Sequence, residues 1–290
     1  MVIQFVVNPG SGSEQQDIQT LIKEYFTGND HQIHILELKK EIRPAEIKAE
    51  IERNSPNRVV AAGGDGTIKL VAQCILNREI SLGILPAGSA NGMALELGIP
   101  LDIPEALEIA VNGQPRTVHA TAVNDEFCIH LADLGFNAYL VKKFDSLPQR
   151  GKLGYARAAW HALWFHRKMQ VELEIDGRKI ESEAAMVVVA NGTMYGTGVR
   201  INPVGTLTDD LFEVVLVKEY SLLEVLKMRF TQTGFNPEKV EFFQTRQLRV
   251  RSRHPVHLQV DGEYQGKVKA LEAHIIPKAL QMILPPGQEI

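Results

Sequence analysis

The sequence Val59-Val60-Ala61-Ala62-Gly63-Gly64-Asp65-Gly66-Thr67-Ile68 joins a short apolar run to a cluster of glycines. The apolar run lacks alternation, which is typical of a strand buried on both faces of a parallel sheet. The glycines allow a sharp turn, and their N–H groups can approach a ligand because no Cβ blocks the way. Apolar residues follow at helical spacing, so the stretch ends at a helix N-terminus that favours an anion. We predict a strand, a phosphate-binding loop and a helix, and an ordinary tight turn is the alternative.

Two other junctions of the same type lie on either side of this stretch. Residues 2–7 predict a buried strand that ends in Asn8-Pro9-Gly10-Ser11-Gly12, and residues 81–86 predict one that ends near Gly88-Ser89. Taken singly, the first loop also fits a plain turn, and Ser89 also fits a helix cap. Strands that alternate with helices predict a parallel sheet, whose strands share one carboxyl edge where ligands bind. Three such loops at one edge predict a site for nucleotide phosphates.

The sequence pattern changes near residue 119. Up to residue 118, strands and helices alternate, which predicts an α/β domain with a parallel sheet. From residue 119 to 276, most segments have the pattern of short strands, which predicts an antiparallel sandwich or barrel. Two helical segments, 155–166 and 222–230, interrupt these strands. We therefore expect an α/β domain followed by a mainly antiparallel β domain.

The composition is that of an ordinary globular protein. The chain has 290 residues, of which 44% are hydrophobic and 23% are charged, and its length suits two domains. The formal net charge of -4 offers no general attraction to nucleic acid or to an anionic membrane. Cys74 and Cys128 are expected to be free, buried thiols in a reducing compartment. Neither a signal peptide nor a run of about 20 apolar residues is found, so we expect a cytoplasmic protein.

Several separated motifs, taken in their order, point to one family. The central loop Gly63–Thr67 resembles the loop shared by diacylglycerol kinase-like lipid kinases, NAD kinases and, more distantly, phosphofructokinases. The whole chain resembles the soluble bacterial lipid kinases of the diacylglycerol kinase catalytic-domain family, which also includes sphingosine and ceramide kinases. This resemblance implies an NAD kinase-like or phosphofructokinase-like α/β domain, then a β-sandwich domain for the lipid, and a C-terminal segment, 277–290, that packs on the first domain. The other motifs that carry the resemblance are Asn8–Gly12, Leu85–Asn91, Gly151–Tyr155, Asn191–Gly198, Asp209–Glu213, Asp261–Glu263 and Pro277–Leu280.

The resemblance also implies an activity and the residues that perform it. The activity is phosphate transfer from ATP, with Mg²⁺, to the hydroxyl of a membrane lipid such as a diacylglycerol, a monoacylglycerol or a sphingoid base. By resemblance, Glu263 accepts the hydroxyl proton and Asp261 supports Glu263, and Asp65 is placed to hold the magnesium ion directly or through water. A further magnesium ion is implied in the β domain, on Asp209 with main-chain oxygens of Thr206 and Leu211. From the residues alone, Asp261-Gly262 also fits a solvated β-turn, and Asp209 also fits a plain acidic turn. The residues expected to bind the nucleotide are Asn8, Pro9, Gly10, Ser11, Gly12, Gly63, Gly64, Asp65, Gly66, Thr67, Ser89 and Asn91.

The sequence departs from the family pattern at three places, and two rival functions are kept. Gly92 and Asn137 stand where the family often has aspartate, and a threonine that often contacts the nucleotide in the family is missing near Leu36-Glu37-Leu38. The nearest rival is an NAD kinase, which shares the central loop, and the other is a non-catalytic nucleotide- or lipid-binding regulator on the same scaffold. The expected partner is a lipid at a membrane surface, reached by transient peripheral association, and no nucleic acid is expected. A homodimer is left open.

Overall fold

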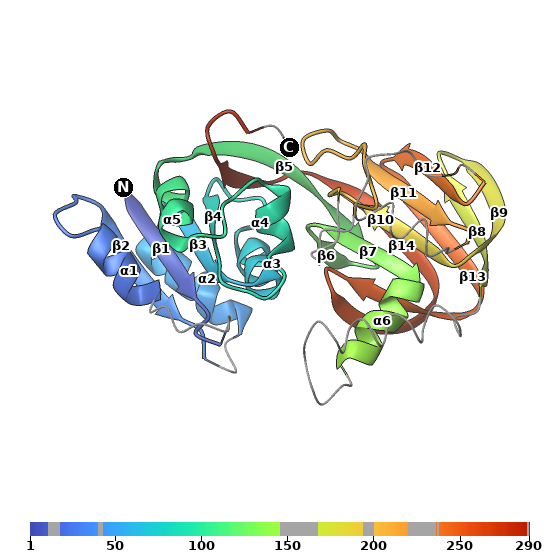
Figure 1. Cartoon of the computed structure of the whole chain (residues 1–290), viewed down its shortest axis with the longest axis horizontal. Helices are drawn as coiled ribbons and strands as arrows, with labels where there is room; N and C mark the ends of the chain where they lie inside the picture. Colours follow the sequence, from blue (N-terminus) through green and yellow to red (C-terminus); the bar gives the residue numbers. More distant parts are fainter. Residues whose placement is uncertain are drawn as a thin grey trace. The chain divides into compact units, whose positions relative to one another are not determined.

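The computed structural model describes residues 1–10, 18–39, 43–145, 168–193, 200–219, 236, 238–288 and 290. The chain divides into two compact units, whose elements are labelled in Figure 1. Unit 1 contains Met1–His119 and Pro277–Ile290, and unit 2 contains most of the residues between them. In the described part of the chain, no helix combines the length and the apolar character that a membrane span requires.

The central sheet of unit 1 is parallel. Its strands lie in the order β4-β3-β1-β2, and every neighbouring pair is parallel. β1, β3 and β4 are almost fully buried, as their unbroken apolar sequences predict, whereas β2 lies at the edge and is only partly covered. The end of β14 (Glu263–Leu284) adds a parallel strand beside β4 through Gln281 and Met282. The bounds are β1 (Val2–Val7), β2 (Gln32–Glu37), β3 (Arg58–Gly63) and β4 (Ser81–Pro86).

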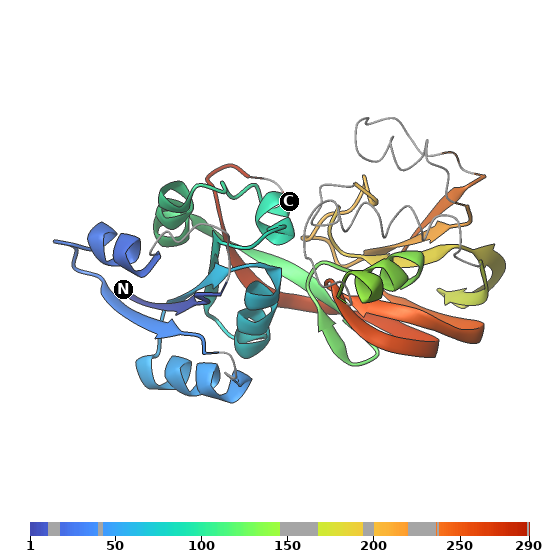
Figure 2. The same ribbon diagram turned by 60° about the horizontal axis from the view of Figure 1, so that its bottom comes forward.

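Helices cover both faces of this sheet. Figure 2 shows α1 and α5 on one face and α2 and α3 on the other. α2 and α5 each have proline in the first turn, where its missing N–H costs no hydrogen bond. Asp102 caps α5, because its carboxylate accepts the N–H of Glu105 at 3.1 Å. The helices described in unit 1 are α1 (Ile18–Tyr25), α2 (Pro44–Asn54), α3 (Asp65–Ile75), α4 (Gly92–Glu96) and α5 (Ile103–Asn112).

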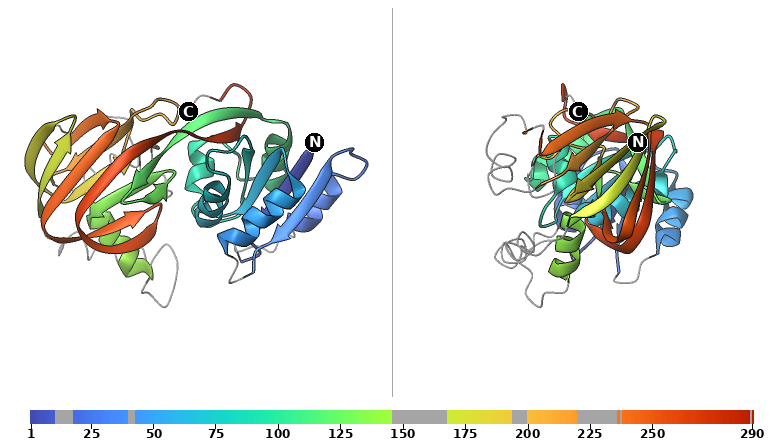
Figure 3. Two further views of the ribbon diagram at one scale, coloured as in Figure 1. Left: turned by 180° about the vertical axis from the view of Figure 1, so that it is seen from behind. Right: turned by 90° about the vertical axis from the view of Figure 1, so that its right-hand side faces the viewer.

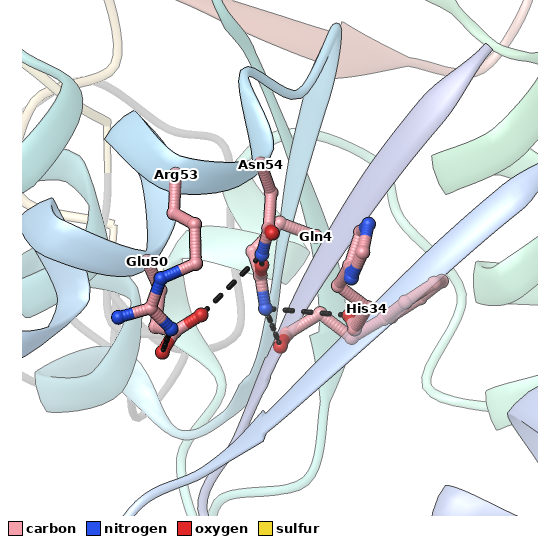
Figure 4. A network of polar contacts seen from close by, with 6 residues as sticks. Gln4, His34, Glu50, Arg53 and Asn54 are labelled. Carbon is pink, nitrogen blue, oxygen red and sulfur yellow. Dashed lines mark hydrogen bonds and ion pairs between the residues drawn. The ribbon is translucent and has the colours of Figure 1, made fainter.

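A buried glutamine joins two strands and a helix of unit 1, as Figure 4 shows. Gln4 lies on β1 and is 1% exposed. Its Nε2 donates to the carbonyl of His34 on β2 at 3.3 Å, and its Oε1 accepts Nδ2 of Asn54 on α2 at 2.7 Å. Because both ends of the amide are hydrogen-bonded, its burial is tolerated, and the residue fixes α2 against the sheet.

Unit 2 is mainly antiparallel. The order β12-β11-β10-β7-β13-β14 is antiparallel at each step, while β8 pairs with β13 and β9 pairs with β8. Figure 3 shows β13 and β14 as two long strands side by side. The boundary between the units falls within β5 and within β14. The remaining elements are β5 (Gln114–Val123), β6 (Glu126–Cys128), β7 (Leu131–Gly135), α6 (Phe136–Asp145), β8 (Met169–Ile175), β9 (Arg178–Ala184), β10 (Met186–Ala190), β11 (Phe212–Val217), β12 (Val240–Thr245) and β13 (Gln247–Val260).

Two apolar clusters form the core of unit 2. Val187 and Val189 of β10 point into the larger cluster, together with residues of β7, β8, β11, β13 and β14. Met186, Val188 and Ala190 point the other way, into a cluster that includes Phe136 and Leu140 of α6. β10 is therefore buried on both faces, which explains its unbroken apolar sequence. The predicted fold class, a parallel α/β domain followed by a mainly antiparallel β domain, is confirmed.

Several element boundaries differ from those that the sequence predicted. The pattern of short strands predicts one strand over 127–131 and two separate strands over 248–251 and 256–260. The structure has two elements, β6 and β7, in place of the first, and one strand, β13, in place of the other two. The apparent break in β13 is a register irregularity between Arg251 and Val256, which interrupts the alternation without ending the strand. α6, β9 and β12 were not predicted from the sequence. The helices expected over 155–166 and 222–230 lie outside the described residues.

Candidate active site

Three loops of unit 1 lie together at the carboxyl edge of its sheet. They follow β1, β3 and β4, which are adjacent because β3 pairs with both of the others. The N–H of Asn8 donates to the carbonyl of Ala62 at 2.9 Å, and its Nδ2 donates to Oγ1 of Thr67 at 3.1 Å. The N–H of Ala87 donates to the carbonyl of Gly63 at 3.0 Å. The central loop is therefore hydrogen-bonded to both of its neighbours.

Some glycines of these loops are required by packing. A Cβ on Gly88 would lie 2.4 Å from the Cα of Gly64, and a Cβ on Gly63 would lie 2.5 Å from Oγ1 of Thr67. Such distances are too short for any other residue. Gly88 therefore lets its loop approach the central loop, and Gly63 leaves room for the side chain of Thr67 in the central loop itself. Gly66 is different, because it is exposed and a Cβ there would meet no atom within 4 Å. Close packing thus accounts for part of this glycine cluster, beside the sharp turn and the ligand approach that the sequence predicts.

Asp65 links the central loop to the loop after β4. It is the first residue of α3, and its two carboxylate oxygens accept the N–H groups of Gly92 and Met93 at 3.0 and 2.9 Å. These donors are the first two residues of α4, so Asp65 caps that helix from another segment. Asn91 closes the preceding turn through two hydrogen bonds with the backbone of Gly88, at 2.8 and 2.9 Å. Each carboxylate oxygen can accept a further interaction, so the cap leaves capacity for a metal ion.

The N-terminus of α3 has no side-chain cap. Its N-cap residue is Gly64, which has no side chain to offer, and the helix dipole therefore makes this end a favourable place for an anion. Pro9, Gly10 and Ser89 lie on the neighbouring loops and are exposed. Ser89 does not cap α4, because the N-cap position of that helix is Asn91. Ser11 and Gly12 lie outside the described residues.

In unit 2, Asp261 and Gly262 form the two-residue turn between β13 and β14. Their φ angles are 50° and 83°, which is typical of the type I′ hairpin turn that Asp-Gly favours. The carboxylate of Asp261 does not point into solvent. It accepts three consecutive backbone N–H groups, from Ile129 at 3.1 Å, His130 at 3.0 Å and Leu131 at 3.2 Å. Asp261 therefore fixes the turn against the segment that joins β6 to β7.

Glu263 follows this turn as the first residue of β14. Its backbone pairs with Val260, the last residue of β13, and the residue is exposed. The position is thus set by the hairpin, while the carboxylate is accessible to solvent. That combination suits a group that has to meet a substrate.

The loop expected to hold a magnesium ion in unit 2 surrounds Asp209. One oxygen of its carboxylate accepts the N–H of Leu211 at 3.2 Å, and Thr206 lies in the same loop. Glu213, two residues further on than Leu211, is 1% exposed. Burial raises the pKa of Glu213, and the charge of Asp209 raises it further. A hard cation would offset this repulsion, and oxygen ligands suit Mg²⁺, so the residues present fit such an ion. Among the described residues, no group of three or more His, Cys, Asp or Glu side chains is arranged for a metal, so main-chain oxygens would have to complete the set.

Comparison with known proteins places this architecture in a family. Residues 3–123 match the model of the diacylglycerol kinase catalytic domain, and residues 132–284 match the model described as the YegS C-terminal NAD kinase beta sandwich-like domain. The chain belongs to the diacylglycerol kinase catalytic-domain family. The predicted resemblance is thereby confirmed.

The chain matches several relatives over most of its length. A probable lipid kinase YegS-like from Yersinia enterocolitica is 31% identical over 243 residues, covering 80% of each chain. The diacylglycerol kinase of Bacillus subtilis is 27% identical over 274 residues, covering 91% of this chain and 90% of the relative. Among solved structures, a diacylglycerol kinase from Bacillus anthracis aligns with a TM-score of 0.76 at 17% identity, over 99% of this chain and 97% of that one, which shows a shared fold.

The structure explains one departure of this family member from the usual pattern. Asn137 donates through Nδ2 to the carboxylate of Asp133 at 2.7 Å. Asp133 lies on β7 and is fully buried. An aspartate at 137 would put a second carboxylate against it, so an amide at this position satisfies the buried acid.

Three polar residues that the structure buries near the candidate site residues were not predicted from the sequence. Asp133 and Gln259 lie beneath the turn of Asp261 and Gly262, and Lys69 lies on α3, where it is only 4% exposed. The position of Lys69 within the apolar pattern of α3 was an available signal, because a lysine there has to be buried. The other two gave no local signal, because their partners are far away in the sequence.

Proposed function

We propose that this chain is an ATP-dependent lipid kinase that uses Mg²⁺ to phosphorylate the hydroxyl of a membrane lipid, such as a diacylglycerol, a monoacylglycerol or a sphingoid base. The observation that carries the proposal is the group of three loops around the N-terminus of α3, which has no side-chain cap. Backbone donors and a helix dipole suit the phosphates of a nucleotide. Membership of a family that includes a diacylglycerol kinase and probable lipid kinases supports the choice of acceptor.

Each candidate residue has a chemical role in this proposal. The loops of unit 1 would bind the phosphates, and Asp65 would hold a magnesium ion, which when bound offsets the negative charge of the transferring phosphate. In unit 2, Glu263 would accept the proton of the lipid hydroxyl. The hydroxyl oxygen forms a bond to the γ-phosphorus, the bond to the β–γ bridging oxygen breaks, and ADP leaves. Asp261 would contribute by holding the turn that carries Glu263.

The proposal is tested by incubating the protein with labelled ATP, Mg²⁺ and a mixed lipid extract. We expect label in a lipid product, which mass spectrometry identifies, and no label in NAD supplied in its place. Transfer to NAD would instead support an NAD kinase. Binding of ATP without transfer to any lipid would support a regulator on a kinase scaffold.

We further propose that the lipid is reached at a membrane surface by transient association from the cytoplasm. Diacylglycerols and sphingoid bases remain in the bilayer, so the protein has to meet them there. Sedimentation with vesicles that contain the substrate lipid, compared with sedimentation with vesicles that lack it, measures this association.

Mg²⁺ is expected to stabilise the protein through the Asp209 loop even without nucleotide. At about ten times its Kd, an ion that binds only the native state raises the free energy of unfolding by about 1.4 kcal/mol. The substitution Asp209→Asn should remove this gain, because it removes the carboxylate of the proposed site. Thermal unfolding with Mg²⁺ or with EDTA measures the difference.

The control for this experiment is Asp210→Asn. Asp210 is adjacent but exposed, and it pairs with Arg246. Its substitution should leave the effect of Mg²⁺ intact. A full stabilisation by Mg²⁺ in Asp209→Asn would contradict the site.

A further inference from the structure

A buried polar pair connects the interior of unit 2 to the turn that carries Glu263. Asp133 on β7 is fully buried, and Gln259 on β13 is 1% exposed. Nε2 of Gln259 donates to the carboxylate of Asp133, and its Oε1 accepts the N–H of Gly262 at 2.6 Å. We call these two residues the Asp133–Gln259 pair. Hydrogen bonds thus connect the buried acid to the glutamine, and the glutamine to the backbone of the turn.

The acid determines which way the glutamine points. The carboxylate of Asp133 also accepts the N–H of Ala138 at 2.8 Å and Nδ2 of Asn137 at 2.7 Å, so it is held by donors from α6. A carboxylate only accepts hydrogen bonds, so the amide nitrogen of Gln259 has to face it. The amide oxygen then faces the N–H of Gly262. A buried network with its donors and acceptors matched in this way has one preferred arrangement.

Both residues of the turn are therefore anchored, and by different parts of unit 2. Asp261 is held by the backbone N–H groups of Ile129, His130 and Leu131, and Gly262 is held by Gln259. The next residue is Glu263, so the direction of its Cα–Cβ bond follows from the backbone angles of the turn. The Asp-Gly sequence by itself favours this hairpin turn, so neither anchor is needed to close the hairpin.

We infer that Asp133 and Gln259 are positioning residues for the carboxylate of Glu263. The inference rests on the proposed function, in which that carboxylate accepts the proton of the lipid hydroxyl. The pair fixes the peptide between Asp261 and Gly262, and thereby the place from which the glutamate reaches its substrate. Misplacement of a reacting group by about 1 Å can slow a reaction about a hundredfold, so an anchor of this kind affects the rate more than the binding of ATP.

The test is Gln259→Met, which keeps the shape of the side chain and removes both hydrogen bonds. The control is Gln281→Met, because Gln281 is also partly buried and makes one side-chain hydrogen bond, to Thr117 at 2.8 Å. We expect Gln259→Met to lower kcat at least about tenfold with an unchanged KM for ATP. A folded Gln259→Met with the kcat of the wild type overturns the inference, and so does an equal loss in Gln281→Met.

A second variant keeps the test decisive if Gln259→Met does not fold. Asp133→Asn combined with Gln259→Glu exchanges donor and acceptor. The new amide can donate one hydrogen to the new carboxylate, which can still accept the N–H of Gly262. The amide of Asn137 then has to turn over, so that its oxygen accepts the other hydrogen in place of the bond that its nitrogen now donates. Each single substitution mismatches the pair, and both should lower kcat. Recovery of kcat in the double variant supports the inference, because two residues that act through one shared hydrogen bond couple, whereas independent losses add up. A folded double variant as slow as the single variants overturns it.

A measurement that needs no turnover separates this inference from the proposed function. Loss of the hydrogen bond from Gly262 should speed the hydrogen exchange of that amide in Gln259→Met, with no such change in Gln281→Met. If the wild type phosphorylates no lipid, the proposed function fails, and the exchange rate still reports on the anchor. Unchanged exchange at Gly262 overturns the role of the pair.

Discussion

Replacing Asp65 by alanine is expected to abolish phosphate transfer while leaving a folded protein. The carboxylate is the proposed ligand of the magnesium ion, and its two oxygens also hold the N–H groups of Gly92 and Met93 at the start of α4. Without it, the charge that develops on the phosphate loses its main stabilisation, and the loop after β4 loses its link to the central loop. We expect kcat to fall about a thousandfold in the lipid assay.

The same substitution has a structural cost that has to be separated from the catalytic one. Loss of a helix cap costs about 1 kcal/mol of stability. Asp102→Ala is the matched control, because Asp102 caps α5 in the same unit and is not among the candidate site residues. Both variants should show a similar decrease in the free energy of unfolding, and only Asp65→Ala should lose activity. If Asp65→Ala retained the kcat of the wild type, the assigned role would be wrong.

The sequence predicted the parts of unit 1 that depend on local pattern. The unbroken apolar runs of β1, β3 and β4 indicate buried parallel strands, and such strands place their following loops at one edge of the sheet. The contact between Asn8 and Thr67 follows from that rule. The cap that Asp65 provides does not follow from it, because the acceptor and its donors are 27 and 28 residues apart. No local pattern encodes such a pairing.

In unit 2, too, the local sequence predicts the turn but not the contacts between residues that are far apart in the chain. Asp-Gly at 261–262 predicts a hairpin turn, and the structure has one. The local sequence indicates no anchor for this turn, yet Asp261 accepts N–H groups that lie 130 to 132 residues earlier. Gln259 and Asp133 are likewise 126 residues apart. These partners meet only because β7 pairs with β13, and strand order could not be obtained from the pattern of short strands.

Glu263→Gln is expected to lower kcat about a hundredfold to ten-thousandfold and to leave stability unchanged. Glutamine has the same shape but cannot accept the proton of the lipid hydroxyl. The residue is exposed, and its place at the start of β14 is fixed by backbone pairing with Val260, so the free energy of unfolding should change by less than about 0.5 kcal/mol. Phosphate transfer to the lipid, measured beside ATP binding, should show normal binding and little transfer.

The control for Glu263→Gln lies on the same strand. Glu272 is an exposed acid of β14 whose carboxylate accepts Nε of Arg249 at 2.8 Å, and Glu272→Gln should keep the kcat of the wild type. The comparison matters because a general loss of negative charge on unit 2 would affect both variants, whereas loss of a base affects one. Transfer by Glu263→Gln at a rate similar to that of Glu272→Gln would exclude Glu263 as the base. The carboxylate that activates the lipid would then have to be sought elsewhere.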